Sequence, residues 1–128
     1  MLCPCKSGKQ YAECCRSFHL GQNPETALQL MRSRYAAYAL NLPQYIIATT
    51  HPDNCCPDVQ AWAQQISAFA LSTDFQSLEI LESREGGSIA TVTFRAGLAC
   101  DHKDASFTET SHFKRVQGKW LYYSGQIH

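Results

Sequence analysis

Apolar side chains between residues 24 and 70 recur at intervals of three and four, which is the period of amphipathic helices. Asn23-Pro24-Glu25 predicts the start of a first helix, because asparagine caps a helix, proline fits its first turn and glutamate suits its positive end. Pro43 starts a second, shorter helix that stops before His51-Pro52, since the residue before a proline avoids helical geometry. Pro57-Asp58 starts a third helix, so this part of the chain is predicted to hold three.

The first and third helices each show one apolar face. The face of the first carries Leu28, Met31, Tyr35, Tyr38 and Leu42, with Arg32 and Arg34 off the stripe. The face of the third carries Val59, Trp62, Ala63, Ile66, Phe69 and Ala70. Such faces are expected to pack on a common partner layer.

From Asp74 the period of the pattern changes from helical to two. Strands are predicted over residues 75–82, 88–100, 105–116 and 119–127, separated by turns at 85–87, 101–104 and 117–118. Hairpins between successive strands imply a mostly antiparallel sheet. The fold class is therefore α+β, with three helices on one face of a curved antiparallel sheet of about four strands. A bent sheet with helices across its mouth leaves a cone-shaped pocket.

The length and charge of the chain restrict the function classes. Its 128 residues fit a domain over residues 21–128 with a small appended knuckle over residues 1–20. A formal net charge of zero weighs against strong attraction to nucleic acid or an acidic membrane, although it leaves room for a local basic patch. No apolar run approaches the roughly 20 residues of a membrane helix, and no secretory signal is visible, so a cytoplasmic location is expected.

Four of the seven cysteines, Cys3, Cys5, Cys14 and Cys15, lie in one short stretch near the N-terminus. Thiolates are soft ligands, and four of them suit one tetrahedral zinc ion. Gly8 lies between the two pairs and can adopt the positive φ that a tight reversal needs. Three alternatives stay open at this point: two disulfides, four free thiols, or an iron–sulfur cluster on the same ligands. Nearby His19 can replace a cysteine as a ligand or be a surface histidine.

The segment Cys3-Pro4-Cys5-x-Ser7-Gly8-Lys9-x-Tyr11-x-x-Cys14-Cys15 resembles the SEC-C motif, the zinc knuckle at the C-terminus of the SecA translocation ATPase. The segment departs from that motif at Lys6, where glycine is usual, and at Ala12-Glu13, where lysines are common. The resemblance implies one Zn²⁺ per chain, bound by the four cysteines. It also implies a contact surface for a partner, with the candidate residues Lys6, Lys9, Tyr11 and Arg16.

The C-terminal segment 112–125 resembles the last hairpin of nuclear transport factor 2-like (cystatin-like) domains. Together with the knuckle, Met31-Arg32-Ser33-Arg34-Tyr35 and Thr50-His51-Pro52, this makes essentially the whole chain similar to the YchJ family of bacterial proteins. The resemblance implies a fold and a zinc site and no reaction. Many members carry a second knuckle at the C-terminus, and this chain ends at His128 without one. We therefore expect either weaker binding to a partner or dimerisation.

Two functions of different classes follow. The first is a zinc-binding adaptor. The resemblance to the SecA knuckle implies that its partner is a protein such as a secretion chaperone, a ribosome, or an anionic surface. A homodimer through the sheet is a further expectation. The alternative is an enzyme or small-molecule-binding protein using the cone pocket. The candidate lining residues are Arg34, Tyr35, His51, Asp53, Glu109, His112 and Trp120. A histidine with an acid partner is the usual general-base pattern, whereas Arg34 and Glu109 are equally suited to a buried ion pair. Redox sensing by Cys55-Cys56 or Cys100 is a third possibility.

Overall fold

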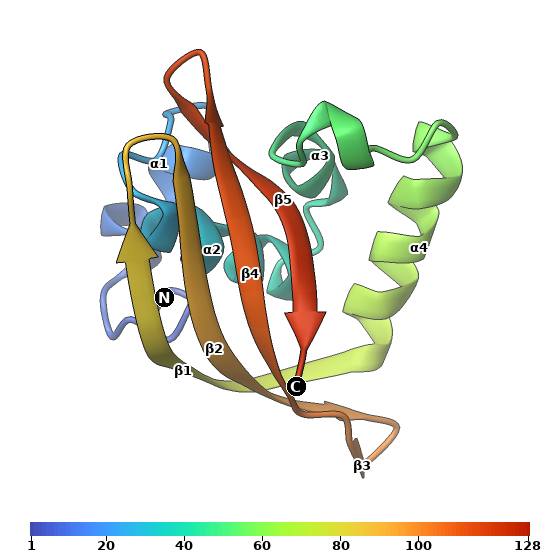
Figure 1. Ribbon diagram of the computed structural model, residues 1–128. Helices are drawn as coiled ribbons and strands as arrows, with labels where there is room; N and C mark the ends of the chain where they lie inside the picture. Colours follow the sequence, from blue (N-terminus) through green and yellow to red (C-terminus); the bar gives the residue numbers. More distant parts are fainter.

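The computed structural model describes residues 1–128 and shows helices lying against the hollow side of a curved antiparallel sheet (Figure 1). The helical segments are the single turns η1 (Tyr11–Glu13) and η2 (Pro52–Asn54) and the helices α1 (Arg16–His19), α2 (Ala27–Ala39), α3 (Pro43–Ala48) and α4 (Val59–Ser72). The strands are β1 (Thr73–Glu85), β2 (Ile89–Cys100), β3 (Lys103–Asp104), β4 (Phe107–Val116) and β5 (Lys119–Ile127). The α+β class is therefore confirmed. None of the helices has the length and apolar character that a membrane span requires.

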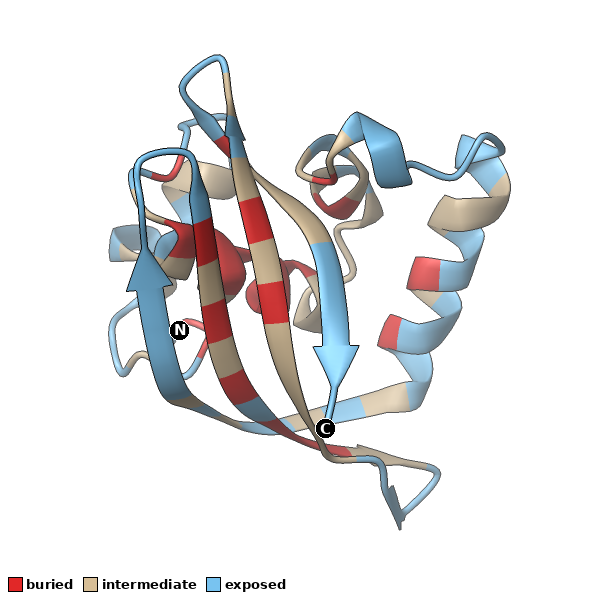
Figure 2. Cartoon of the chain, in the orientation of Figure 1, coloured by how far each residue is buried: buried red, intermediate tan, exposed pale blue.

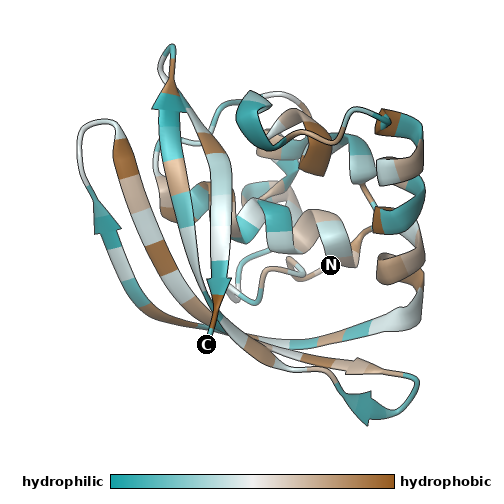
Figure 3. Cartoon of the chain, turned by 45° about the vertical axis from the view of Figure 1, so that its right-hand side comes forward, coloured by the Kyte–Doolittle hydropathy of each residue, from teal (hydrophilic) through white to brown (hydrophobic).

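The sheet has the order β1-β2-β4-β5, with every neighbouring pair antiparallel and β3 paired to β2. It holds five strands rather than four, because Asp101 and His102 both adopt positive φ and turn the chain back on β2. Two register shifts in β1, at Phe75/Ser77 and Ile80/Glu82, mark bulges that bend the strand. The turned view in Figure 3 shows the resulting curl around the helices.

The start of α2 differs from the sequence prediction. Thr26, not Asn23, is the N-cap: its hydroxyl accepts from the backbone N–H of Gln29 at 3.1 Å, and the Gln29 side chain accepts from the Thr26 N–H at 3.3 Å. This reciprocal capping box satisfies two helix-end donors and therefore wins over the isolated asparagine cap. The predicted starts of α3 at Pro43 and of α4 after Asp58 are confirmed, and Asp58 caps Ala61 at 3.0 Å.

The core lies between α2 and the inner face of the sheet. Alternate residues of β2 from Ala90 to Leu98 are buried, which Figure 2 shows as bands along the strand and which confirms the predicted period of two. They pack with Leu30, Met31 and Tyr35 of α2. Arg34 was placed off the apolar stripe of this helix and is nevertheless buried, because α3 folds over that side of α2.

The segment after α3 is attached to the free edge of β5. The N–H of His51 donates to the Tyr122 carbonyl at 2.8 Å, and the N–H of Tyr122 donates to the Thr49 carbonyl at 2.8 Å. This short parallel bridge covers part of an otherwise open sheet edge. It also fixes α3 against the strand whose Tyr122 side chain lines the cavity described below.

Candidate metal centre and a charged cavity

The four cysteine sulfurs near the N-terminus converge on one point. Every Sγ of Cys3, Cys5, Cys14 and Cys15 lies within 4.8 Å of the others. The Sγ of Cys14 lies 3.6 Å from that of Cys5 and 3.9 Å from that of Cys15. Four sulfurs bound tetrahedrally at about 2.3 Å from one zinc ion lie about 3.8 Å apart. The donor set therefore fits a single four-coordinate metal ion.

Local backbone turns produce this convergence. The N–H of Cys3 donates to the Lys9 carbonyl at 2.8 Å, which closes the loop between the two cysteine pairs. Gly8 has φ +86°, as its position between the pairs predicted. Lys6 has φ +65°, so a lysine occupies a left-handed position that glycine adopts more easily.

The protonation of the cluster reflects the closeness of the sulfurs. The neighbouring Cys15 thiol holds the pKa of Cys5 down at about 4. The same interaction raises the pKa of Cys15, because a second thiolate would lie against the first. Metal ions displace such protons when they bind.

The knuckle, residues 1–20, is attached to α2 through side-chain contacts that the sequence did not predict. Arg32 Nη1 donates to the Cys5 carbonyl at 3.0 Å. Half-buried His19 lies 2.8 Å from the Ser33 carbonyl through Nε2 and 2.6 Å from the Tyr11 hydroxyl through Nδ1. A carbonyl only accepts, so Nε2 carries the proton and Nδ1 accepts from Tyr11. Burial lowers the pKa of His19, which agrees with this neutral form. His19 is thus neither a metal ligand nor a free surface residue.

The candidate contact residues of the knuckle fall into two groups. Lys6, Lys9 and Arg16 are exposed around the cluster. Tyr11 is half-buried and packs against the cysteines, with its hydroxyl used by His19. Only the three cations are therefore free to meet another molecule.

A cavity of about 370 Å³ lies between the helices and the inner face of the sheet. Thirteen of its 17 lining residues are hydrophobic, among them Met31, Ile66, Phe94 and Phe113. Three of the seven sequence candidates, Arg34, Tyr35 and Glu109, are in its wall. Such a wall, largely apolar with a few charged groups, is typical of small-ligand sites.

Arg34 and Glu109 do not form the ion pair that was considered for them. Arg34 Nη1 donates to the Ile46 carbonyl at 3.0 Å and to the hydroxyls of Thr49 and Thr50 at 2.7 and 3.3 Å. Burial lowers the pKa of Arg34, although an arginine side chain stays charged in proteins. Glu109 Oε2 accepts from Ser111 and, at 3.4 Å, from the Tyr122 hydroxyl.

Tyr122 separates the two charges. The Arg34 guanidinium lies 4.4 Å from the centroid of the Tyr122 ring, while the Tyr122 hydroxyl donates to Glu109. Burial, followed by the nearby Glu109 charge, raises the pKa of Tyr122. Ser111 and Tyr122 also line the cavity. The only signal for them in the sequence is the period-two pattern, which places them on the inner face of β4 and β5.

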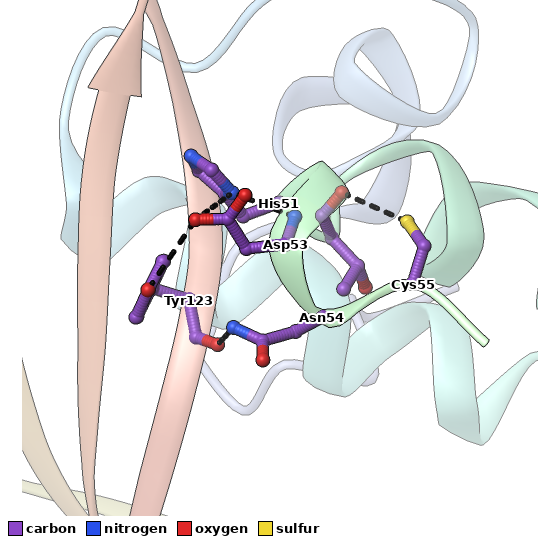
Figure 4. Close-up of polar contacts among 6 residues, drawn as sticks. His51, Asp53, Asn54, Cys55 and Tyr123 are labelled. Atoms are coloured by element: carbon purple, nitrogen blue, oxygen red, sulfur yellow. Dashed lines mark hydrogen bonds and ion pairs between the residues drawn. The ribbon is translucent and has the colours of Figure 1, made fainter.

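His51 and Asp53 lie outside the cavity, on the outer side of β5 (Figure 4). Their neighbour is Tyr123, whose ring centroid is 5.0 Å from that of His51 and whose hydroxyl lies 3.4 Å from Asp53. Tyr122 pairs with the inward-facing Phe113 and lines the cavity, whereas Tyr123 is the extra residue of a register shift between β4 and β5 and lies outside the cavity. The parallel bridge between β5 and the segment before η2 places both polar residues on the Tyr123 side.

His112 and Trp120 do not line the cavity either. His112 is one position from the inward-facing Ser111 and Phe113 and lines a separate hollow of about 640 Å³ with Lys114 and Tyr123. Trp120 is 2% exposed, and its indole Nε1 donates to the Glu25 carbonyl at 3.3 Å, so it belongs to the core. Neither candidate histidine thus meets an acid inside the cavity, whereas outside it His51 Nδ1 lies 3.8 Å from Asp53 Oδ2.

The three remaining cysteines are isolated from the cluster. Cys55 and Cys56 are exposed on the loop before α4, where Cys55 Sγ lies 3.6 Å from the Thr50 carbonyl. Cys100 is half-buried at the end of β2, where its Sγ lies 3.8 Å from the hydroxyl of Ser72 at the end of α4.

Comparison with known proteins agrees with this architecture. The model of the YchJ middle NTF2-like domain matches residues 26–125, and the SEC-C motif matches residues 2–17. The chain belongs to the YchJ family. A UPF0225 protein of Haemophilus influenzae (strain PittEE) is 37% identical over 122 residues, covering 94% of this chain and 74% of its own length. A UPF0225 protein of Corynebacterium glutamicum is 36% identical, covering 98% of this chain and 96% of its own length.

Solved structures show the same fold. A SEC-C motif containing protein from Rhodopseudomonas palustris, solved in solution, has a TM-score of 0.86 at 35% identity and covers 100% of this chain and 99% of its own. A crystal structure of a SEC-C motif containing protein from Psychrobacter arcticus has a TM-score of 0.79 at 26% identity, covering 98% and 82%. The predicted YchJ resemblance is thus confirmed.

Proposed function

We propose that this protein is a zinc-stabilised interaction module. In this proposal Cys3, Cys5, Cys14 and Cys15 bind one Zn²⁺ per chain, and the knuckle so folded contacts a partner protein in the cytoplasm. The observation that carries the proposal is the separation of the sulfurs, 3.6 and 3.9 Å, beside the about 3.8 Å of a tetrahedral zinc site. All seven cysteines are free thiols, which supports a reducing compartment.

A zinc ion here has a structural role. Four thiolates fill the coordination sphere, whereas catalytic zinc sites keep a position for water or substrate. The ion would cross-link the two ends of a loop that buries few residues of its own. Its binding free energy would then be folding free energy for the knuckle.

The charge around the cluster restricts the kind of partner. Four thiolates and one Zn²⁺ carry a net charge of minus two, and Glu13 adds one negative charge. Lys6, Lys9 and Arg16 supply three positive charges that balance this sum. The knuckle is then near neutral as a whole, with cations at its surface. We expect short-range pairing with acidic side chains of a protein and little long-range steering, so the association rate should depend weakly on salt.

Native mass spectrometry of the full chain, purified without chelator or added metal, tests the zinc site. One zinc per chain is expected, and the Cys14→Ser variant should lose it. The matched control is Cys56→Ser, which removes an exposed thiol outside the cluster. Zinc retained by Cys14→Ser, bound iron, or paired cysteines would each contradict the ligand assignment.

A photo-crosslinking amino acid introduced at Gln10, beside Lys9, tests the partner surface in cells. Cross-linking to a defined protein should disappear in Cys14→Ser and in the double variant Lys6→Glu/Lys9→Glu. It should persist in Lys119→Glu, because Lys119 is an exposed lysine at the start of β5. Equal cross-linking in all variants would show that the knuckle does not make the contact.

A further inference from the structure

The guanidinium of Arg34 has donors that no protein acceptor uses. Arg34 is 8% exposed and uses only Nη1 in hydrogen bonds, while Nε and Nη2 contact no acceptor. The three ion pairs of the structure all lie elsewhere. Burying a charge with only neutral partners is costly, and an anion that completed its hydrogen bonds would offset part of that cost.

Glu109 offers the opposite charge in the same cavity. Its Oε2 accepts from Ser111 and Tyr122, and its Oε1 has no donor in the protein. A Cβ at Gly125 of β5 would collide with this carboxylate and with the Tyr122 hydroxyl, so the absent side chain makes room for both. The cavity therefore has a cationic end and an anionic end, held apart by Tyr122.

We propose that the cavity binds a small amphiphilic carboxylate, whose acid group pairs with Arg34, whose apolar body packs against Met31, Phe94 and Phe113, and whose hydrogen-bond donor meets Glu109. The volume of about 370 Å³ lies at the lower end of the range for small-ligand sites, about 300–1,000 Å³. This site goes beyond the interaction role of the knuckle and does not rest on it.

The chemistry of the wall selects this ligand class over simpler ones. A purely apolar molecule would shield Arg34 and Glu109 from water without pairing either. A dianion would place its second negative charge against Glu109, and a simple amine would place its positive charge against Arg34, so each would be repelled at one end of the cavity. A planar guanidinium pairs with a carboxylate through two parallel hydrogen bonds, and sites with buried polar groups strongly reject analogues that leave those groups unpaired.

The test is an NMR titration of the zinc-loaded full chain with four probes that share one aromatic body. L-Phenylalanine carries both groups, 3-phenylpropanoate only the acid, 2-phenylethylamine only the donor, and ethylbenzene neither. We expect L-phenylalanine to bind most tightly, 3-phenylpropanoate about tenfold more weakly, and the other two at least tenfold more weakly still. Shifts should gather at Met31, Ser111 and Tyr122. Equal binding by ethylbenzene, or no binding of any probe below 10 mM (about tenfold above a 1 mM Kd), would overturn the proposal.

Two variants separate the two ends of the cavity. Glu109→Gln keeps the shape of the side chain and should remove the advantage of L-phenylalanine over 3-phenylpropanoate while the latter still binds. Arg34→Met should abolish binding of both acids, with exposed Arg95→Met as the matched control. Since Arg34 also holds the end of α3, Glu109→Gln keeps the proposal testable if Arg34→Met does not fold. An unchanged probe preference in Glu109→Gln would overturn the role of Glu109.

Discussion

The knuckle and the cavity are built on opposite principles, although both lie against α2. In the knuckle, four like side chains from one short stretch point at a common centre and form a closed donor set. In the cavity, two unlike charges from α2 and β4 stay apart among apolar side chains. The first arrangement suits a permanent ion, and the second suits a ligand that enters and leaves.

Three consecutive residues of α2 connect the two regions. Arg32 donates to the Cys5 carbonyl, the Ser33 carbonyl receives His19, and Arg34 reaches the cavity wall. Successive helical residues point about 100° apart, so one turn can serve the knuckle on one side and the cavity on another. Variants can therefore disturb the knuckle, the cavity or this junction separately.

The largest effect is expected from removing the metal. Structural zinc contributes about 10–16 kcal/mol to the folding of zinc-finger peptides. Chelation or Cys14→Ser should therefore unfold residues 1–16 while residues 24–127 stay folded. Hydrogen exchange resolved by residue would show fast exchange in the knuckle alone. Loss of protection along β2 as well would mean that the two regions fold as one unit.

The next largest effect is expected from a change in the cavity wall that leaves the knuckle intact. Phe113 is 1% exposed and lies in the cavity wall, so Phe113→Ala should lower the free energy of unfolding by about 3–5 kcal/mol. Zinc content should stay at one per chain, because no cluster residue contacts Phe113. Phe69→Ala is the control: Phe69 is 41% exposed and should cost much less. Urea unfolding with parallel zinc analysis measures both, and zinc loss in folded Phe113→Ala would contradict the separation.

A smaller effect is expected at the junction. Tyr11→Phe removes the hydroxyl that donates to His19 Nδ1 and leaves that half-buried nitrogen without a donor, at a cost of about 1–3 kcal/mol. The domain should melt almost as before, while amide exchange in residues 1–19 speeds up. Tyr123→Phe, which loses only an exposed contact to Asp53 at 3.4 Å, is the control and should change little. Equal exchange in both variants would show that His19 does not hold the knuckle in place.

The contrast between the regions also explains what the sequence predicted. The four cysteines are close in the chain, so spacing alone brought their chemistry together, and the period of two located β2 and β4 within a few residues. The cavity depends on register between distant strands: the sequence placed Arg34, Tyr35 and Glu109 with His51, Asp53, His112 and Trp120, and only the first three share a wall. Ser111 and Tyr122 line the cavity, whereas their chain neighbours His112 and Tyr123 lie outside it, so an error of one residue in the register exchanges the two sets. The docking of His19 needed the tertiary contact of α1 with α2, which no local pattern shows.

The smallest effect is expected inside the knuckle, where Lys6 has a left-handed backbone at φ +65°. A non-glycine residue pays about 1–2 kcal/mol for this conformation, and Lys6→Gly relieves it. Glycine also gives the unfolded chain more freedom, which offsets about 0.4–1 kcal/mol of this relief, so the net gain in stability should lie between about 0 and 1.6 kcal/mol. The measurable result is a zinc dissociation rate that falls by no more than about fifteenfold. Gly8→Ala, at φ +86°, is the reverse change and should speed zinc release. If Lys6→Gly released zinc faster, the lysine charge beside the thiolates would outweigh backbone strain, and the knuckle would be held more by electrostatics than by its turn.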